Sequence, residues 1–175
     1  MAAGFRTTLL YTDNVPLSPD QEDELRLRRV ALGELLHQSD FVVLCLPLLP
    51  TTKHMVNRDF LARMKPSALL INTARGSLVD EVAVADALEG DRLAGYGADV
   101  FSMEDWALPE RPSEVMTRLL ESEKTVLTPH LGSAVDRVRR EIALQAADSM
   151  LQALRGQAPV GALNRPLSPR PPVLS

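Results

Sequence analysis

Residues 68–76 read ALLINTARG. An apolar run that ends in polar residues and a glycine is typical of a buried parallel strand followed by a functional loop. Short apolar runs of the same kind recur along the chain, and segments with helical spacing lie between them. This alternation predicts an α/β fold in which a parallel sheet is connected by crossover helices.

Runs of the same kind and the segments between them predict further strands and helices. We expect strands at residues 7–11, 41–46, 68–72, 95–100 and 125–128. We expect helices at residues 30–37, 57–64 and 79–88, with Asp80 capping or beginning the third. A long last helix is predicted to begin at Ser133, with Asp136 three places on as a variant of the capping box. After Arg155 the chain is rich in glycine and proline, which predicts irregular structure.

Composition and charge narrow the class of protein. With 175 residues, 45% of them hydrophobic, the chain can bury one domain core. The net charge is −4, and the basic cluster at residues 26–29 directly follows acidic residues, so no nucleic-acid partner is expected. The apolar runs are far shorter than the roughly 20 residues that span a bilayer, and no signal-peptide pattern is seen, so we expect no membrane partner and a cytoplasmic protein. No metal-ligand cluster stands out.

The single cysteine lies at the end of an apolar run. Cys45 follows residues 41–44, so a disulfide within the chain is excluded and an inert buried thiol is expected. Pro47, two places on, lacks the N–H that a strand would donate, so the backbone can leave the sheet there and curl over a ligand.

Three ionisable side chains each follow a short apolar run, where parallel sheets build their sites. Arg75 can hold an oxyanion by two parallel hydrogen bonds; the alternative is a surface arginine paired with Asp80. His130 can pass a proton near neutral pH, and Glu104 would orient its imidazole and raise its pKa. The alternative for His130 is a side chain that satisfies a buried carbonyl.

Asp13 follows the first expected strand. A carboxylate at this place in a dinucleotide-binding fold accepts hydrogen bonds from the adenosine ribose, and its charge repels the 2′-phosphate of NADP, so NAD is expected. The alternative is that Asp13 and Asn14 only begin a turn before Pro16.

The phrases around Arg75, Glu104 and His130 resemble the catalytic triplet of the D-isomer-specific 2-hydroxyacid dehydrogenases, and the likeness runs from about Gly4 to Pro166. The resemblance implies a partial Rossmann-type parallel sheet, catalysis by these three residues, and NAD as cofactor. The family places a G-x-G-x-x-G turn early in its nucleotide-binding domain, and this chain has none, so the first strand and the Gly-rich turn are expected to be missing. The residues implied to contact the cofactor are Asp13, Cys45, Leu46, Pro47, Thr73, Ala74, Arg75, Asp99 and His130.

By the same resemblance the chain corresponds to the carboxyl-terminal half of such an enzyme. Residues 1–133 would form an incomplete NAD-binding domain, residues 134–155 a long helix that returns towards the substrate domain, and residues 156–175 a Pro-rich tail. The pyrophosphate site and the family's substrate-binding lysine would lie upstream of Met1. We therefore expect this chain alone to bind NAD weakly and to turn over slowly or not at all, and a full-length form to be a homodimer.

Within the family the likeness is greatest to the members that oxidise phosphite. Most members continue the glutamate motif with proline, whereas Glu104 here continues into Asp105-Trp106-Ala107. The resemblance also implies substrate contacts from Ser133 and from Arg139, a second cation suited to a doubly charged oxyanion. Oxidation of phosphite by NAD is the expected function, with His130 as the base. The alternatives are an organic D-2-hydroxy acid as substrate and, from another class, an NAD-sensing binding protein that resembles the family's corepressors.

Overall fold

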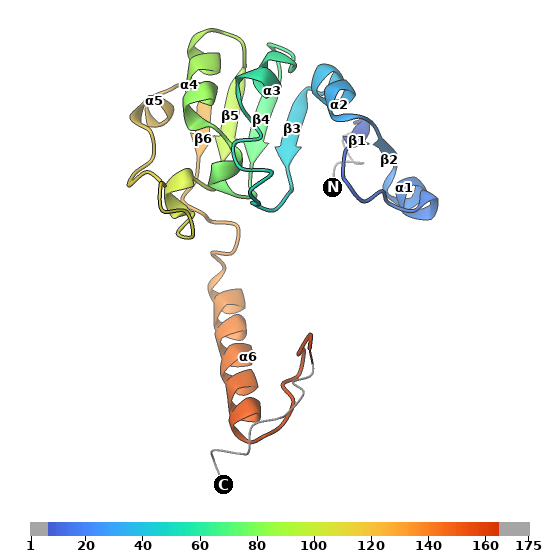
Figure 1. Ribbon diagram of the computed structural model, residues 1–175, viewed down its shortest axis with the longest axis vertical. Coiled ribbons are helices and arrows are strands. Elements are labelled where there is room, and N and C mark those ends of the chain that lie inside the picture. The colour runs from blue at the N-terminus through green and yellow to red at the C-terminus, as the bar shows by residue number, and fades with distance from the viewer. Residues whose placement is uncertain (1–6, 165–175) are drawn as a thin grey trace. The chain divides into compact units, whose positions relative to one another are not determined.

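The fold is that of a computed structural model, which describes residues 7–164 (Figure 1). It divides into two units, residues 1–129 and residues 130–175, which are described separately. The strands are β1 (Leu9–Tyr11), β2 (Leu27–Arg29), β3 (Phe41–Leu44), β4 (Leu69–Asn72), β5 (Gly95–Ala98) and β6 (Thr125–Leu127). The helices are α1 (Pro19–Leu25), α2 (Leu32–Gln38), α3 (Arg58–Ala62), α4 (Glu81–Glu89), α5 (Thr117–Leu120) and α6 (Asp136–Leu154), with short 3-10 helices η2 (Gly76–Leu78) and η3 (Ser102–Glu104).

The strands form two parallel sheets. β1 pairs with β2 in the smaller one. The larger sheet has the order β3-β4-β5-β6, with Phe41 opposite Leu69 and Leu69 opposite Gly95. Its successive strands are connected through α3, α4 and α5, which confirms the predicted α/β class.

All five predicted strands are present, each one or two residues shorter than expected. β3, β5 and β6 end earlier than predicted, where the chain turns into loops at the carboxyl edge of the sheet, whereas β1 and β4 begin later than predicted. β2, α1 and α5 were not predicted. The first two have few buried side chains, and α1 has none, so no apolar periodicity marks them.

Local capping explains where the internal helices begin. Asp80 caps α4, since its carboxylate accepts hydrogen bonds from Val82 N and Ala83 N at 3.1 and 3.2 Å. The predicted capping role of Asp80 is therefore confirmed, and the helix begins at Glu81, two residues after the predicted start at residue 79. Asn57 caps α3 in the same way, accepting from Phe60 N at 3.0 Å.

The predicted start of the last helix is wrong. α6 begins at Asp136, and its N-cap is Val135, whose side chain makes no capping hydrogen bond. Ser133 lies outside the helix because its carbonyl accepts from Val135 N at 2.9 Å, which closes a tight turn. The predicted capping box between Ser133 and Asp136 is therefore not formed.

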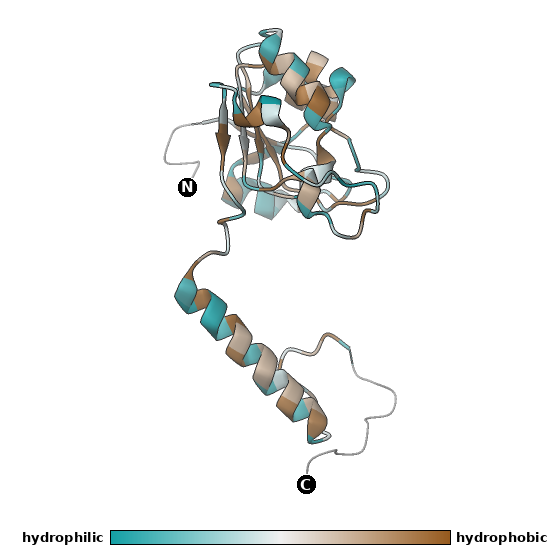
Figure 2. Ribbon diagram, turned by 90° about the vertical axis from the view of Figure 1, so that its left-hand side faces the viewer, coloured by the Kyte–Doolittle hydropathy of each residue, from teal (hydrophilic) through white to brown (hydrophobic). Residues whose placement is uncertain are grey.

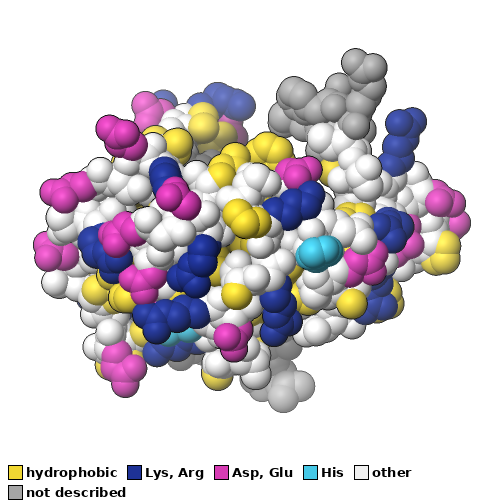
Figure 3. Space-filling model, turned by 90° about the horizontal axis from the view of Figure 1, so that it is seen from above, with side chains coloured by type: hydrophobic (Ala, Val, Ile, Leu, Met, Phe, Trp, Pro, Cys, Tyr) yellow, Lys and Arg dark blue, Asp and Glu magenta, His cyan; other side chains and the backbone are white. Residues whose placement is uncertain are grey.

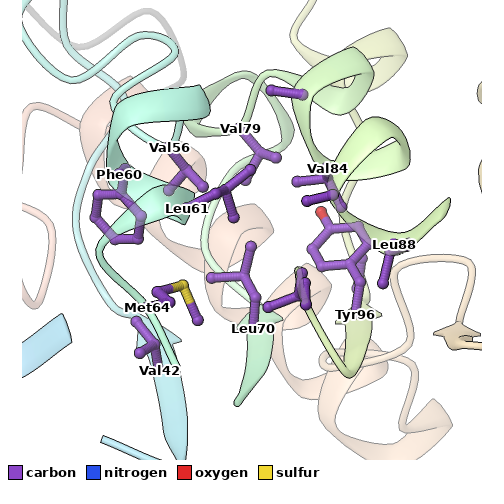
Figure 4. Close-up of a cluster of buried hydrophobic side chains, with 14 of the residues drawn as sticks. Val42, Val56, Phe60, Leu61, Met64, Leu70, Val79, Val84, Leu88 and Tyr96 are labelled. Carbon is purple, nitrogen blue, oxygen red and sulfur yellow. The ribbon is translucent and has the colours of Figure 1, made fainter. Parts of the chain in front are cut away.

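The core lies on one face of the larger sheet, under α3 and α4 (Figure 4). Leu70 of β4 and Tyr96 of β5 pack with Val84 and Leu88 of α4, and all four side chains are at most 3% exposed. Parallel strands usually carry apolar residues on both faces because helices cover both. Phe41 and Val43, by contrast, are 61% and 50% exposed on β3, so the opposite face of the sheet at this strand is not covered by the rest of the first unit, residues 7–129.

The second described unit consists mainly of α6. Hydrophilic residues dominate its first turns and apolar residues recur further along (Figure 2). None of its residues is buried. Over residues 7–164 the structure has no helix that is both long enough and apolar enough to span a membrane. The proline residues of the predicted irregular tail from Pro166 onward lie outside the described residues.

Basic and acidic side chains are interspersed on the surface shown in Figure 3. One cluster connects three helices. Arg118 of α5 donates to both carboxylate oxygens of Glu89 at 2.7 and 2.6 Å and to Asp86 at 2.9 Å. Arg58 of α3 donates to the other oxygen of Asp86 at 2.7 Å.

We expect acid to weaken the fold through this cluster. The pKa of Asp86 is held below its ordinary value, chiefly by the hydrogen bond from Arg58 and secondly by the one from Arg118. The hydrogen bond from Arg118 also lowers the pKa of Glu89. Because the folded-state pKa values are depressed, this stabilisation is present above the unfolded-state pKa and is lost as the pH falls through the folded-state values. Urea unfolding from neutral pH down to about pH 3 should show this loss.

The control for this prediction is a second arginine. Arg118→Gln should flatten the dependence of unfolding free energy on pH, whereas Arg155→Gln, at an exposed site outside the cluster, should leave it unchanged. Equal slopes in the parent chain and in Arg118→Gln would contradict the prediction.

Candidate active site

A cleft of about 710 Å³ opens at the carboxyl edge of the larger sheet. Ligands of open α/β sheets bind in this position, beyond the ends of the strands. Three segments line the cleft: residues 44–48 from the end of β3, residues 73–75 after β4, and residues 104–107 from the end of η3. The predicted site residues that the cleft brings together are Cys45, Leu46, Pro47, Thr73, Ala74, Arg75 and Glu104.

Asn72 shapes the loop that presents Arg75. Its side chain is fully buried at the end of β4. The amide oxygen accepts from Ala74 N at 3.1 Å, and the amide nitrogen donates to the Arg75 carbonyl at 2.9 Å. The sequence analysis gave Asn72 no role, although an Asn that ends an apolar strand is a known signal for such a side-chain-closed turn.

Arg75 itself is exposed at the cleft. Its Nη1 donates to the Ala74 carbonyl at 2.6 Å. The alternative pairing with Asp80 is not found, because the Asp80 carboxylate caps α4. Among the ion pairs of residues 7–164 none includes Arg75. Its charge is therefore available to an anionic ligand in the cleft.

The loops after β4 and β5 touch at Gly76. A Cβ atom on Gly76 would lie 1.9 Å from the carbonyl carbon of Phe101, so only glycine fits. One residue further, Ser77 N donates to the Asp105 carboxylate at 2.7 Å. These two contacts bring the segment that carries Glu104 against the loop of Arg75, and both side chains line the same cleft.

The Glu104 carboxylate is oriented by its own turn. Oε1 accepts from Phe101 N at 2.9 Å, and the side chain is half-buried. A carboxylate held in this way can orient a histidine, which is the role predicted for Glu104 towards His130. That pairing stays a prediction.

Asp99 connects two strand ends. Thr128 Oγ1 donates to Asp99 Oδ1 at 2.5 Å, and Asp99 N donates to the Asn72 carbonyl at 3.0 Å. Asp99 is not among the residues that line the cleft. Its predicted contact with the cofactor stays a prediction.

Asp13 forms the turn that the alternative interpretation described. Its Oδ1 accepts a hydrogen bond at 2.9 Å from the backbone N–H of Val15, which follows Asp13 by two residues. Arg29 of β2 donates from Nη2 to the Asp13 carbonyl at 2.9 Å, a contact that the sequence analysis missed. The predicted ribose contact stays a prediction. The guanidinium of Arg29 places a positive charge beside Asp13 at this end of β1.

His130, Ser133 and Arg139 belong to the second unit. His130 is exposed and has φ 54°, a left-handed conformation that is uncommon outside glycine and is enriched at functional sites. Arg139 Nε donates to the Ser133 carbonyl at 3.0 Å, so these two predicted substrate-binding residues lie together.

The expectation of a buried Cys45 thiol is wrong. Cys45 is exposed and lines the cleft. The side chains of β3 alternate, with Val42 and Leu44 in the core and Phe41 and Val43 on the uncovered face, and Cys45 continues the exposed series. Counting the run as uniformly apolar ignored this period of two.

Cys45 offers a direct test of cofactor binding in the cleft. We expect a colour-forming disulfide reagent to modify this thiol in the native chain, and NAD to slow the reaction in proportion to its occupancy, since the cofactor would cover the cleft. Cys45→Ser supplies the blank. Labelling that proceeds only after denaturant is added would contradict the exposed position. Labelling that is unaffected under conditions in which NAD is shown to be bound would argue against cofactor contact at Cys45.

The fold and the cleft together define a class of protein. A parallel sheet with crossover helices and a ligand cleft at its carboxyl edge is the arrangement of dinucleotide-binding domains. Residues 1–132 match the family described as D-isomer specific 2-hydroxyacid dehydrogenase, NAD binding domain. The chain belongs to this family of NAD-dependent oxidoreductases.

Two curated reductases and one solved dehydrogenase structure are similar to this protein over most of its chain. A glyoxylate reductase from Korarchaeum cryptofilum is 38% identical over 172 residues, which cover 98% of this chain and 49% of the relative. A glyoxylate/hydroxypyruvate reductase B from Pectobacterium carotovorum is 39% identical over 161 residues, which cover 92% and 48%. The NAD-complexed D-isomer specific 2-hydroxyacid dehydrogenase from Lactobacillus delbrueckii ssp. bulgaricus superposes with a TM-score of 0.75 at 29% identity, over 93% of this chain and 50% of that one.

The comparisons confirm the predicted family, its fold and its NAD cofactor. The chain spans about half the length of the curated relatives that it matches. These relatives are named for glyoxylate and hydroxypyruvate. The predicted special likeness to phosphite-oxidising members is therefore not supported by them.

Proposed function

We propose that the complete protein transfers a hydride between NAD and a small 2-oxo acid such as glyoxylate, forming the matching 2-hydroxy acid. The observation that carries this proposal is the cleft in which the uncompensated Arg75 guanidinium and the oriented Glu104 carboxylate stand together. The names of the relatives support glyoxylate as the representative substrate.

Each residue has a proposed role in this reaction. Residues 45–47, Thr73 and Ala74 would hold NAD, which supplies or accepts the hydride when bound. Arg75 binds the substrate anion by paired hydrogen bonds and so orients the carbonyl. His130 donates a proton to the carbonyl oxygen during reduction and accepts it back during oxidation, and Glu104 favours its protonated form.

Asp13 and Arg29 bear on the choice of cofactor. Oδ1 of Asp13 is engaged by Val15 N, so the ribose hydroxyls would be bound by the other carboxylate oxygen. The proposed preference for NAD rests on repulsion between this carboxylate and a 2′-phosphate, which the neighbouring Arg29 partly offsets.

Phosphite is the second candidate substrate. It is favoured by the segment Glu104-Asp105-Trp106-Ala107, which resembles the phosphite-oxidising members and lines the cleft. Arg139 would add a second cation for a doubly charged oxyanion. In this reaction hydride leaves phosphorus for NAD, water supplies the new oxygen, and His130 accepts the proton of that water.

The assay uses a catalytically complete protein, made by joining residues 1–175 to the amino-terminal half of a relative. We expect oxidation of NADH with glyoxylate or hydroxypyruvate. Faster reduction of NAD with phosphite would instead establish the second candidate. NAD binding without turnover of any of these substrates would overturn both and favour the corepressor-like alternative. Light scattering on the same protein tests the proposed homodimer; the cytoplasmic location stays a prediction.

A further inference from the structure

Trp106 is an exposed aromatic side chain in the cleft. It is the only tryptophan of the chain and is 80% exposed. It lines the cleft together with Arg75 and Glu104. An indole combines a large apolar surface with one polar group, so aromatic residues left in water at the mouth of a cleft mark a surface that contacts a ligand.

The backbone of Trp106 is fixed beside the loop that carries Arg75. Its N–H donates to the Glu104 carbonyl at 2.9 Å. The preceding residue, Asp105, accepts from Ser77 N at 2.7 Å, which ties the segment to the loop that carries Arg75. Trp106 therefore cannot move away from the predicted anion clamp without breaking these contacts.

The indole ring is held by a second residue, Arg111. The guanidinium carbon lies 3.9 Å from the centroid of the Trp106 ring, which is the geometry of a cation–π contact. Nη1 of the same guanidinium donates to the Met103 carbonyl at 3.2 Å. Arg111 thus spans from the start of this loop to the ring and restricts how the ring can turn.

We propose that Trp106, positioned by Arg111, is the wall of the cleft that limits the size of the group carried by the substrate. The substrate class is a small oxyanion whose side group is no larger than hydroxymethyl, bound beside Arg75. Arg111 acts only through the ring and is a positioning residue. This inference rests on the proposed function, because it assumes that substrate binds at Arg75.

The hold of Arg111 on the ring can be measured in the chain as it is. Because Trp106 is the only tryptophan, its fluorescence reports on this site alone. We expect Arg111→Gln to lower the steady-state anisotropy of the tryptophan emission and to shift the emission maximum. Arg111→Lys should keep the anisotropy and the maximum closer to the parent values. The control Arg92→Gln, at an exposed arginine that does not line the cleft, should change neither the anisotropy nor the emission maximum. Identical spectra and anisotropy in Arg111→Gln would overturn the positioning role.

The selectivity is measured in the catalytically complete protein with glyoxylate and the bulkier phenylglyoxylate. Trp106→Ala should raise the ratio of kcat/KM for the large over the small substrate about tenfold or more, mainly through KM, and Arg111→Gln should shift it in the same direction by less. An unchanged ratio in an active Trp106→Ala variant would overturn the inference while the proposed function stands. Loss of all activity in the parent protein would instead overturn the proposed function, and the anisotropy result would still decide the role of Arg111.

Discussion

Arg75→Ala should lower kcat/KM for the 2-oxo acid about a thousandfold in the catalytically complete protein, the upper end of the range for removing one charge-stabilising donor from an active site. The structure supports a large effect because no carboxylate in the described residues shares the Arg75 charge. An anion in the cleft would therefore lose the basic side chain that lines it. Initial rates of NADH oxidation at varied substrate concentration give the measurement.

Two further variants sharpen this experiment. Arg75→Lys keeps the charge but lacks the planar fork, so an intermediate loss is expected. Arg63→Ala removes an exposed arginine that does not line the cleft and should retain the parent rate. Arg75→Ala should keep the parent circular dichroism spectrum, because the Arg75 side chain is exposed. A folded Arg75→Ala protein with the parent kcat/KM would remove Arg75 from the mechanism.

Gly76→Ala should cost about 3 kcal/mol of unfolding free energy, the upper end of the usual range for overpacking. The new Cβ would lie 1.9 and 2.2 Å from the carbonyl carbon and oxygen of Phe101. These are backbone atoms, so relief requires the loops after β4 and β5 to separate. Gly76 does not have a positive φ, so lack of space is the cause of the cost. Urea unfolding of the chain followed by circular dichroism measures it.

The matched control is Gly33→Ala in α2. A Cβ there meets nothing within 4 Å, and alanine is the better helix former, so this change should be neutral or stabilising by up to about 1 kcal/mol. If both glycine variants unfold at the same urea concentration, the close contact between the two loops is not present in solution.

The larger sheet was predictable because its strands carry their own signals. Residues 68–72 and 41–46 are apolar runs followed by Asn, Thr or Pro, and the crossover helices begin at capping residues such as Asp80. β2 was not predictable in this way, since Arg28 and Arg29 are exposed and β2 pairs with a single neighbour. A short strand at the edge of a sheet needs little apolar surface, so its sequence resembles that of a loop.

The chemical residues of the site were easier to predict than the residues that hold them in place. Arg75 and Glu104 stand in recognisable phrases, and the cleft contains both. The roles of Gly76 and Arg111 depend on contacts with side chains or backbone elsewhere in the folded loops, namely Gly76 with Phe101 and Arg111 with Trp106. Such contacts are not encoded as a local pattern, so propensity and periodicity cannot reveal them.

The uniformly parallel pairing of the strands also sets the pace at which the chain can fold. Parallel neighbours cannot be joined by a two-residue hairpin. Leu69 of β4 can therefore pair with Phe41 of β3 or Gly95 of β5 only across a long connection that contains a helix. The loop-closure entropy of such non-local pairing is lost before any contact between the strands forms, so we expect the chain to refold more slowly than the microsecond times of small helical proteins. β4 joins two neighbours in the larger sheet. Substitutions in β4 should therefore slow refolding, whereas those at the outer strand β6 should mainly hasten unfolding.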